Sequence, residues 1–151
     1  MQEQILLTTL GYEKIQKELQ ELKGRRQQMA ERIRLAREFG DLSENSEYED
    51  AKNEQSFMEG RILELEEMLR RAKVVAKNGT DKVEVGSVVI LKMDGQTLEY
   101  TIVGASESDP ASGKISVESP LGYSLIDKVK GERVEIATPN GKMTCEIIAI
   151  K

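Results

Sequence analysis

The chain of 151 residues has no histidine, no tryptophan and a single cysteine, Cys145. Without histidine, the sequence excludes histidine-based acid–base catalysis and metal sites that use imidazole ligands. One cysteine cannot form a disulfide within the chain, which fits a reducing compartment. No apolar run approaches the roughly 20 residues that a membrane span needs, and Met1 is not followed by the basic stretch and apolar core of a signal peptide. These absences favour a soluble, cytoplasmic protein that does not contact a membrane.

Charge, in contrast, is abundant: 32% of the residues are charged, and the formal net charge is −5. A negative net charge argues against simple nonspecific binding to a nucleic-acid duplex. The distribution along the chain is uneven. Residues 23–37 include six basic residues and one acidic residue, whereas residues 38–50 include six acidic residues and no basic one. The sequence therefore predicts a basic segment that gives way abruptly to an acidic one.

Two long stretches alternate spacings of three and four between seam positions, which is the pattern of a coiled coil. We expect the first helix to run from Leu10 to Asp41, with Thr9 as its N-cap. Its seam positions are Ile15, Leu19, Leu22, Arg26, Met29, Ile33 and Ala36. The second seam comprises Tyr48, Ala51, Gln55, Met58, Ile62, Leu65, Leu69 and Ala72. Pairing residues whose numbers sum to 84 matches the two seams layer by layer, which predicts antiparallel packing with the reversal centred on Leu42.

The reversal falls within residues 40–48, which we call the acidic turn. Gly40 suits the left-handed position that ends many helices, and Ser43 or Asn45 can cap the helix that follows. Turn chemistry and heptad register therefore place the reversal in the same stretch of sequence.

The carboxylates of the acidic turn, Asp41 and Glu44, are open to two interpretations. In the first, the acids only stabilise the positive N-terminal end of the second helix, and the protein is a coiled-coil adaptor. In the second, they are hard oxygen ligands for Mg²⁺ or Mn²⁺. Two carboxylates cannot fill an octahedral shell, so a second surface would have to supply phosphate and further carboxylates. Arg37 and Lys52, the basic residues nearest the turn on its two sides, could then contact a nucleic-acid strand.

The C-terminal half has a different period. We expect the second helix to end between Lys73 and Lys77, and residues 78–80 to form a linker. Apolar residues then alternate with period two, which predicts strands at residues 87–92, 98–103, 114–118, 133–137 and 143–150. Ser119 and Pro120 predict the N-cap and first residue of a short helix that continues to Lys128. The predicted fold class is α+β: an antiparallel α-helical coiled-coil hairpin over residues 1–77, followed by a small α+β domain with a mostly antiparallel sheet over residues 78–151.

The acidic turn, with the sequence GDLSENSEY, resembles the tip signature of the Gre transcript-cleavage factors. Supporting matches are TLGYEK at residues 9–14, FMEGRI at 57–62, SPLG at 119–122 and PNG at 139–141. The resemblance therefore covers the whole chain. It implies a coiled coil followed by an FKBP-like domain without isomerase activity, which docks on bacterial RNA polymerase at the mouth of its secondary channel.

The resemblance also implies a mechanism. Asp41 and Glu44 would help to hold a Mg²⁺ ion in the polymerase active site, which then hydrolyses backtracked RNA near its 3′ end. The ion would be held jointly with the polymerase and not tightly by the free protein. The chain would thus be an accessory factor and not itself an enzyme. The alternative within the family is a channel-binding inhibitor of the same fold, which would occupy the polymerase without promoting cleavage.

Further roles follow from the same resemblance. Ser43 and Asn45 would support the tip, and the free protein is expected to be a monomer. Arg37 and Lys52 fall where the family carries basic residues near the RNA. The polymerase-docking segment would include Ser119 and Pro120.

Overall fold

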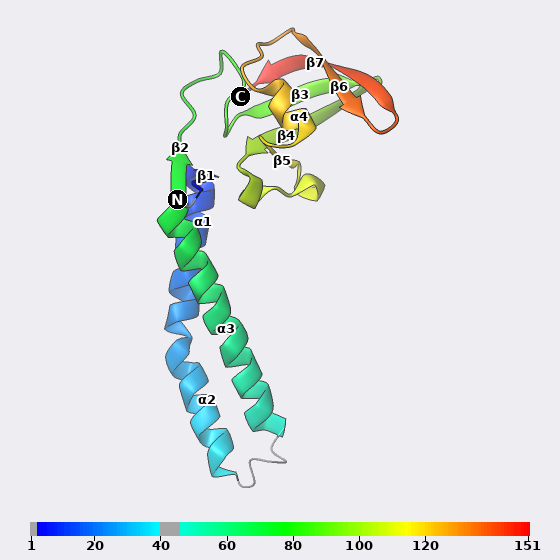
Figure 1. Ribbon diagram of the computed structural model, residues 1–151. Helices are drawn as coiled ribbons and strands as arrows, with labels where there is room; N and C mark the ends of the chain where they lie inside the picture. The colour runs from blue at the N-terminus through cyan, green and yellow to red at the C-terminus, as the bar shows by residue number, and fades with distance from the viewer. Residues whose placement is uncertain (1–2, 40–45) are drawn as a thin grey trace. The chain divides into compact units, whose positions relative to one another are not determined.

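The computed structural model describes residues 3–39 and 46–151, and its elements belong to two units (Figure 1). One unit consists of residues 13–71 and is helical. The other combines the N-terminal residues through Tyr12 with residues 72–151 and contains all the strands. The predicted α+β class is confirmed.

The helical unit is a hairpin in which α2 runs beside α3 (Figure 1). The predicted first helix is interrupted: α1 spans Thr9–Gly24, α2 spans Arg26–Glu38, and Arg25 lies between them. The Arg25 N–H is shared between the carbonyl oxygens of Glu21 at 3.2 Å and Leu22 at 3.1 Å. Gly24 precedes the break, and glycine weakens a helix interior because it leaves the backbone less restricted. The returning helix, α3, spans Ser46–Arg71 without interruption.

The predicted seam forms the core of the hairpin. Its central cluster of buried side chains consists of Met29, Ile33, Ala51, Met58 and Ile62. Leu19, Leu22 and Tyr48 pack against this cluster. The polar seam residue Arg26 is exposed and reaches across to Glu59, with 2.9 Å between Nη2 and Oε2. The heptad pattern thus located the packed face of the hairpin. Its polar residue Arg26 is exposed at the edge of that face.

Two short strands, β1 (Ile5–Thr8) and β2 (Ala72–Val75), form a parallel pair that was not predicted from the sequence. The expected helical continuation to residues 73–77 is therefore wrong. Branching at Cβ makes the side chains of Val74 and Val75 better suited to a strand than to a helix. The partner strand is supplied from the other end of the sequence, and Leu7 within it is fully buried.

The C-terminal residues form a five-stranded sheet in the order β5-β4-β3-β7-β6. The strands are β3 (Val88–Met93), β4 (Gln96–Val103), β5 (Lys114–Ser116), β6 (Arg133–Thr138) and β7 (Gly141–Ile150). All neighbours are antiparallel except β4 and β5. The five predicted strands are confirmed, with β5 two residues shorter than expected. The sheet packs with α4 (Pro120–Leu125), which ends before the predicted Lys128, around a core of Val83, Val89, Leu91, Ile102, Leu125, Val134, Ile136, Cys145 and Ile147.

The N-terminal strand is fastened to the 3-10 helix η1 (Ala105–Glu107), which follows β4. The Glu107 carboxylate accepts hydrogen bonds from the Thr8 backbone N–H at 2.8 Å and the Thr8 hydroxyl at 2.6 Å. The same hydroxyl accepts a bond from the Gly11 N–H at 3.0 Å. Thr8, and not the expected Thr9, is therefore the residue that caps α1.

Among the described residues, no helix combines the length and apolar character needed to cross a membrane.

Candidate functional site

Four of the predicted site residues, Asp41, Ser43, Glu44 and Asn45, lie outside the described residues. In the sequence they stand between the last residue of α2, Glu38, and the first residue of α3, Ser46. The described part of the candidate site therefore consists of the final turn of α2 and the first turns of α3.

Arg37 contacts the side chain of Tyr48, and the charge of Lys52 acts on the same side chain. The Cζ atom of Arg37 lies 5.7 Å from the centre of the Tyr48 ring. A hydrogen bond from the Arg37 side chain lowers the pKa of the Tyr48 phenol, and the positive charges of Arg37 and Lys52 act in the same direction. The two predicted nucleic-acid contacts thus belong to one cluster, although they come from different helices.

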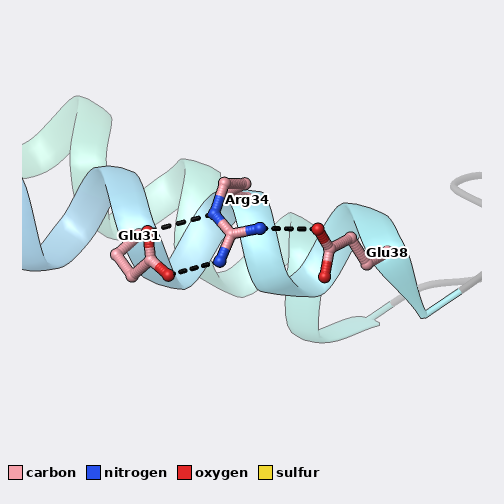
Figure 2. A network of polar contacts seen from close by, with 3 residues as sticks. All are labelled: Glu31, Arg34 and Glu38. Atoms are coloured by element: carbon pink, nitrogen blue, oxygen red, sulfur yellow. Dashed lines mark hydrogen bonds and ion pairs between the residues drawn. The ribbon is translucent and has the colours of Figure 1, made fainter.

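Other cations of the predicted basic segment are compensated by acids. In Figure 2, the Arg34 guanidinium lies between two carboxylates of its own helix. Its Nε and Nη2 donate to Glu31 at 3.0 and 2.5 Å, and its Nη1 donates to Glu38 at 2.5 Å. These contacts raise the pKa of Arg34 and lower that of Glu31. The charge of Arg34 is therefore largely cancelled locally.

Further ion pairs join α1 and α2 to α3 across the hairpin. Arg32 pairs with both Glu47 and Glu54. The other pairs are Lys23 with Glu66, Arg26 with Glu59, and Glu18 with Arg61. Within residues 3–39 and 46–151, Arg37 and Lys52 form no ion pair. The basic segment that the sequence predicts is consequently neutralised along much of its length by acids of the described residues, and Arg37 is not among the cations paired in this way.

No group of three or more potential metal ligands occurs in the part of the chain that the structure describes. The acidic turn supplies a different donor set, the carboxylates of Asp41 and Glu44. Their oxygen atoms match the ligands that Mg²⁺ takes, and one or two carboxylates are the usual protein contribution when phosphate and water complete the shell. The donor set therefore fits a shared Mg²⁺ ion.

Ser119 and Pro120 form the start of α4, as predicted. The Ser119 hydroxyl donates to the Ser116 carbonyl oxygen at 2.6 Å and accepts from the Gly122 N–H at 3.1 Å. A Cβ atom at Gly122 would lie 2.0 Å from the Ser116 carbonyl oxygen, so this close turn requires glycine. Because the Ser119 hydroxyl is engaged within the fold, the exposed ring of Pro120 is the part of this pair that a partner can meet.

The heptad pattern predicts Tyr48 only as a seam residue, and the ring does pack against the hairpin core. Its contact with Arg37 was not predicted. The spacing of four between Tyr48 and Lys52, which places both on one face of a helix, was the available signal. Arg37 gave no comparable signal, because its contact with Tyr48 crosses between helices.

Comparisons with known proteins agree along the whole chain. The family model described as "Transcription elongation factor, N-terminal" matches residues 5–74, and "Transcription elongation factor, GreA/GreB, C-term" matches residues 77–151. The chain is 49% identical over 150 residues to transcription elongation factor GreA of Bacillus cereus strain AH187, covering 96% of this chain and 95% of that protein. It is 47% identical to the GreA factor of Clostridium botulinum strain Hall, covering 96% and 94%.

Among solved structures, the transcription factor Gfh1 is similar at 30% identity, with 99% of each chain covered and a TM-score of 0.50. Two family models together span nearly all of the sequence, and relatives approaching half identity extend over the same length. The chain therefore belongs to the GreA/GreB family of transcription elongation factors.

Proposed function

We propose that this chain enters the secondary channel of bacterial RNA polymerase and brings Asp41 and Glu44 to the active site, where backtracked RNA is cleaved near its 3′ end. The coarser function follows from the family: the chain is a transcription elongation factor that stimulates transcript cleavage and is not itself the catalyst. Its partner is RNA polymerase, and it acts in the bacterial cytoplasm. The observation that carries the finer proposal is the GDLSENSEY sequence between two antiparallel helices.

The proposed division of labour assigns residues 1–77 to the arm and residues 78–151 to docking. The core of the hairpin and its cross-helix ion pairs stiffen the arm that carries the acidic turn. Ser43 and Asn45 would support the acidic turn, and one or the other would cap the start of the second helix. The segment around Ser119 and Pro120 contacts the polymerase. The free chain is proposed to be a monomer, since its partner is the polymerase.

Asp41 and Glu44 would hold a Mg²⁺ ion together with ligands from the polymerase. Such an ion supplies activation of a water molecule for attack on the phosphodiester. Neither carboxylate needs to bind the ion tightly in the free protein, because two oxygen ligands leave most of an octahedral shell to water. Arg37 and Lys52 would contact phosphates of the extruded RNA, since neither forms an ion pair within residues 3–39 and 46–151.

The test uses halted, backtracked elongation complexes with labelled RNA and Mg²⁺. The parent protein should shorten the RNA from its 3′ end, whereas the Asp41→Asn/Glu44→Gln double variant should be slower by about 10²-fold or more, the usual effect of removing groups that stabilise a transition-state charge. Competition against labelled parent protein should show that the double variant still binds the polymerase.

A matched control is the Glu49→Gln/Asp50→Asn variant, which removes the same charge from exposed positions just beyond the acidic turn. It should retain cleavage stimulation. Equal loss in both double variants would attribute the effect to net charge and contradict metal holding. Slower elongation without RNA shortening by the parent would overturn stimulation in favour of the channel-binding inhibitor.

A further inference from the structure

Tyr48 lies in the first turn of α3, where the Arg37 guanidinium from α2 lies over its ring. The charge of Lys52, also on α3, acts on the Tyr48 phenol. We propose that Tyr48 is a positioning residue that orients Arg37, so that Arg37 and Lys52 act as one phosphate-binding pair for the backtracked RNA strand. This inference rests on the proposed function, because it takes RNA phosphate as the ligand of the two cations.

The Tyr48 ring is held in place by the hairpin itself. It is half-buried and packs against the cluster of buried seam residues that includes Ala51. A ring fixed on this core offers one face and its hydroxyl to neighbouring side chains. The side chain can therefore act as a stationary support for longer, more mobile cations.

Arg37 uses this support from α2. Its guanidinium lies over the ring, with 5.7 Å between Cζ and the ring centre, within the range of a cation–π contact. The Arg37 side chain also donates a hydrogen bond to the phenol. Two interactions with one rigid side chain restrict where the guanidinium can point.

Lys52 approaches from α3, one helical turn beyond Tyr48 on the same face. Its charge acts on the Tyr48 phenol, and its Nζ donates to Gln55 Oε1 at 3.3 Å. Both of these partners are uncharged side chains. Lys52 is thus held on the Tyr48 face of α3 without forming an ion pair in the described part of the chain.

The chemistry of the partner is what distinguishes this pair from its neighbours. Arg32 and Arg34 are oriented by ion pairs with glutamates, and the same ion pairs cancel their positive charge. A neutral phenol orients a guanidinium through its ring face and hydroxyl but leaves the full positive charge. The ring of Tyr48 and the amide of Gln55 leave the charges of Arg37 and Lys52 in place, so both cations can attract an RNA phosphate. The arrangement therefore favours an anion at this end of the hairpin.

The first experiment tests the contact without polymerase. The chain has four tyrosines, and their ionisation can be followed by phenolate absorbance as the pH is raised. One tyrosine should ionise below the ordinary value near 10, and this transition should disappear in Tyr48→Phe. The Arg37→Gln variant should shift the same transition upward. An unchanged titration in Arg37→Gln would overturn the proposed contact.

The second experiment measures cleavage as a function of factor concentration, so that half-saturation and maximal rate are separated. Tyr48→Leu should raise the half-saturating concentration by about 2- to 5-fold, the factor that corresponds to an exposed cation–π contact, with the maximal rate unchanged. Tyr48→Phe, which keeps the ring, should lie between parent and Tyr48→Leu. The matched control is Phe57→Leu, an aromatic on α3 that is 82% exposed and lies outside the cluster; it should behave as the parent.

A double variant separates positioning from simple structural support. If Tyr48 acts through Arg37, Tyr48→Leu/Arg37→Gln should be little weaker than Arg37→Gln alone. Effects that multiply would show that Tyr48 contributes independently and would overturn the inference while leaving the proposed function intact. Failure of the parent protein to stimulate cleavage would instead remove the proposed function, and the inference with it.

Discussion

At the scale of single residues, Gly104 shows how a side chain can be excluded by a neighbour far away in the sequence. A Cβ atom at Gly104 would lie 1.8 Å from the carbonyl oxygen of Leu6 in β1. Its φ of −69° and ψ of 159° are accessible to any residue. The requirement for glycine therefore comes entirely from the close approach of the N-terminal strand.

Gly104→Ala should accordingly destabilise the protein. Relief of the contact requires β1 or η1 to move, at a cost of about 1–3 kcal/mol that is typical of overpacking. The measurement is the free energy of unfolding in urea. Gly60→Ala is the matched control, because a Cβ at this exposed position in α3 meets nothing within 4 Å. It should stabilise the protein by about 0.5–1 kcal/mol through helix propensity, and destabilisation by both would contradict the contact argument.

Individual site residues could be predicted where neighbouring residues in the sequence are enough to identify their role. The acids of the turn and the nearest flanking cations can be found by position in the sequence, and the Ser119 cap by its dipeptide with Pro120. The contact of Arg37 with Tyr48 could not, since it depends on how two helices are rotated about their axes. The pairing of Arg32 with Glu47 and Glu54 was hidden for the same reason.

At the scale of elements, the hairpin is stabilised by ion pairs between its helices as well as by packing of its seam residues. The pKa of Glu18 is lowered chiefly by a hydrogen bond from Arg61, and that of Glu59 chiefly by one from Arg26. In both cases desolvation opposes the shift. These carboxylates therefore prefer the ionised form more strongly in the folded hairpin than in the unfolded chain.

This preference predicts acid sensitivity of the hairpin. Because the folded pKa lies below the unfolded value of about 4.5, the unfolded chain binds more protons as the pH falls through that range. The pairs contribute stability above pH 4.5, and this contribution is lost as the pH falls through the folded pKa values. Urea midpoints measured from pH 7 to 3 should show a smaller pH dependence for Glu18→Gln/Arg61→Gln than for the parent. An equal dependence in both proteins would contradict a role for this pair.

Helices and strands could be predicted where the spacing of apolar residues is enough to define them. Heptad spacing located α2 and α3, and alternation located the strands of the sheet. The break at Arg25 and the strand β2 were not predictable in this way. Ala72 continues the heptad spacing, and basic residues suit a helix C-terminus, so the local pattern favoured helix. The pairing of β2 with β1 is a tertiary contact, and it overrides the local preference.

At the scale of the whole molecule, the spacing of apolar residues changes from a period of 3.5 to a period of 2, which predicts a helical part followed by a part built on strands. The family models match both parts. The heptad pattern begins only after the first residues of the chain. In the structure, those residues complete a β pair with Ala72–Val75 and contact η1. Segments from the two halves of the sequence are therefore needed to build the unit that contains the sheet.

Thr8→Val tests this dependence with a change of nearly equal shape. The substitution removes the hydroxyl that donates to Glu107 at 2.6 Å and accepts from the Gly11 N–H. Since the first bond involves a carboxylate and the second caps α1, the loss should lower the free energy of unfolding by about 1–3 kcal/mol. Urea denaturation followed by circular dichroism provides the measurement. Ser112→Ala removes a hydroxyl that bonds only locally, to Asp109 at 2.8 Å on an exposed turn, and should change stability far less. Similar decreases in the free energy of unfolding of the two variants would mean that the bond between residues 8 and 107 stabilises the protein no more than a surface contact does. A decrease confined to Thr8→Val would show that the N-terminal strand helps to stabilise the sheet-containing unit.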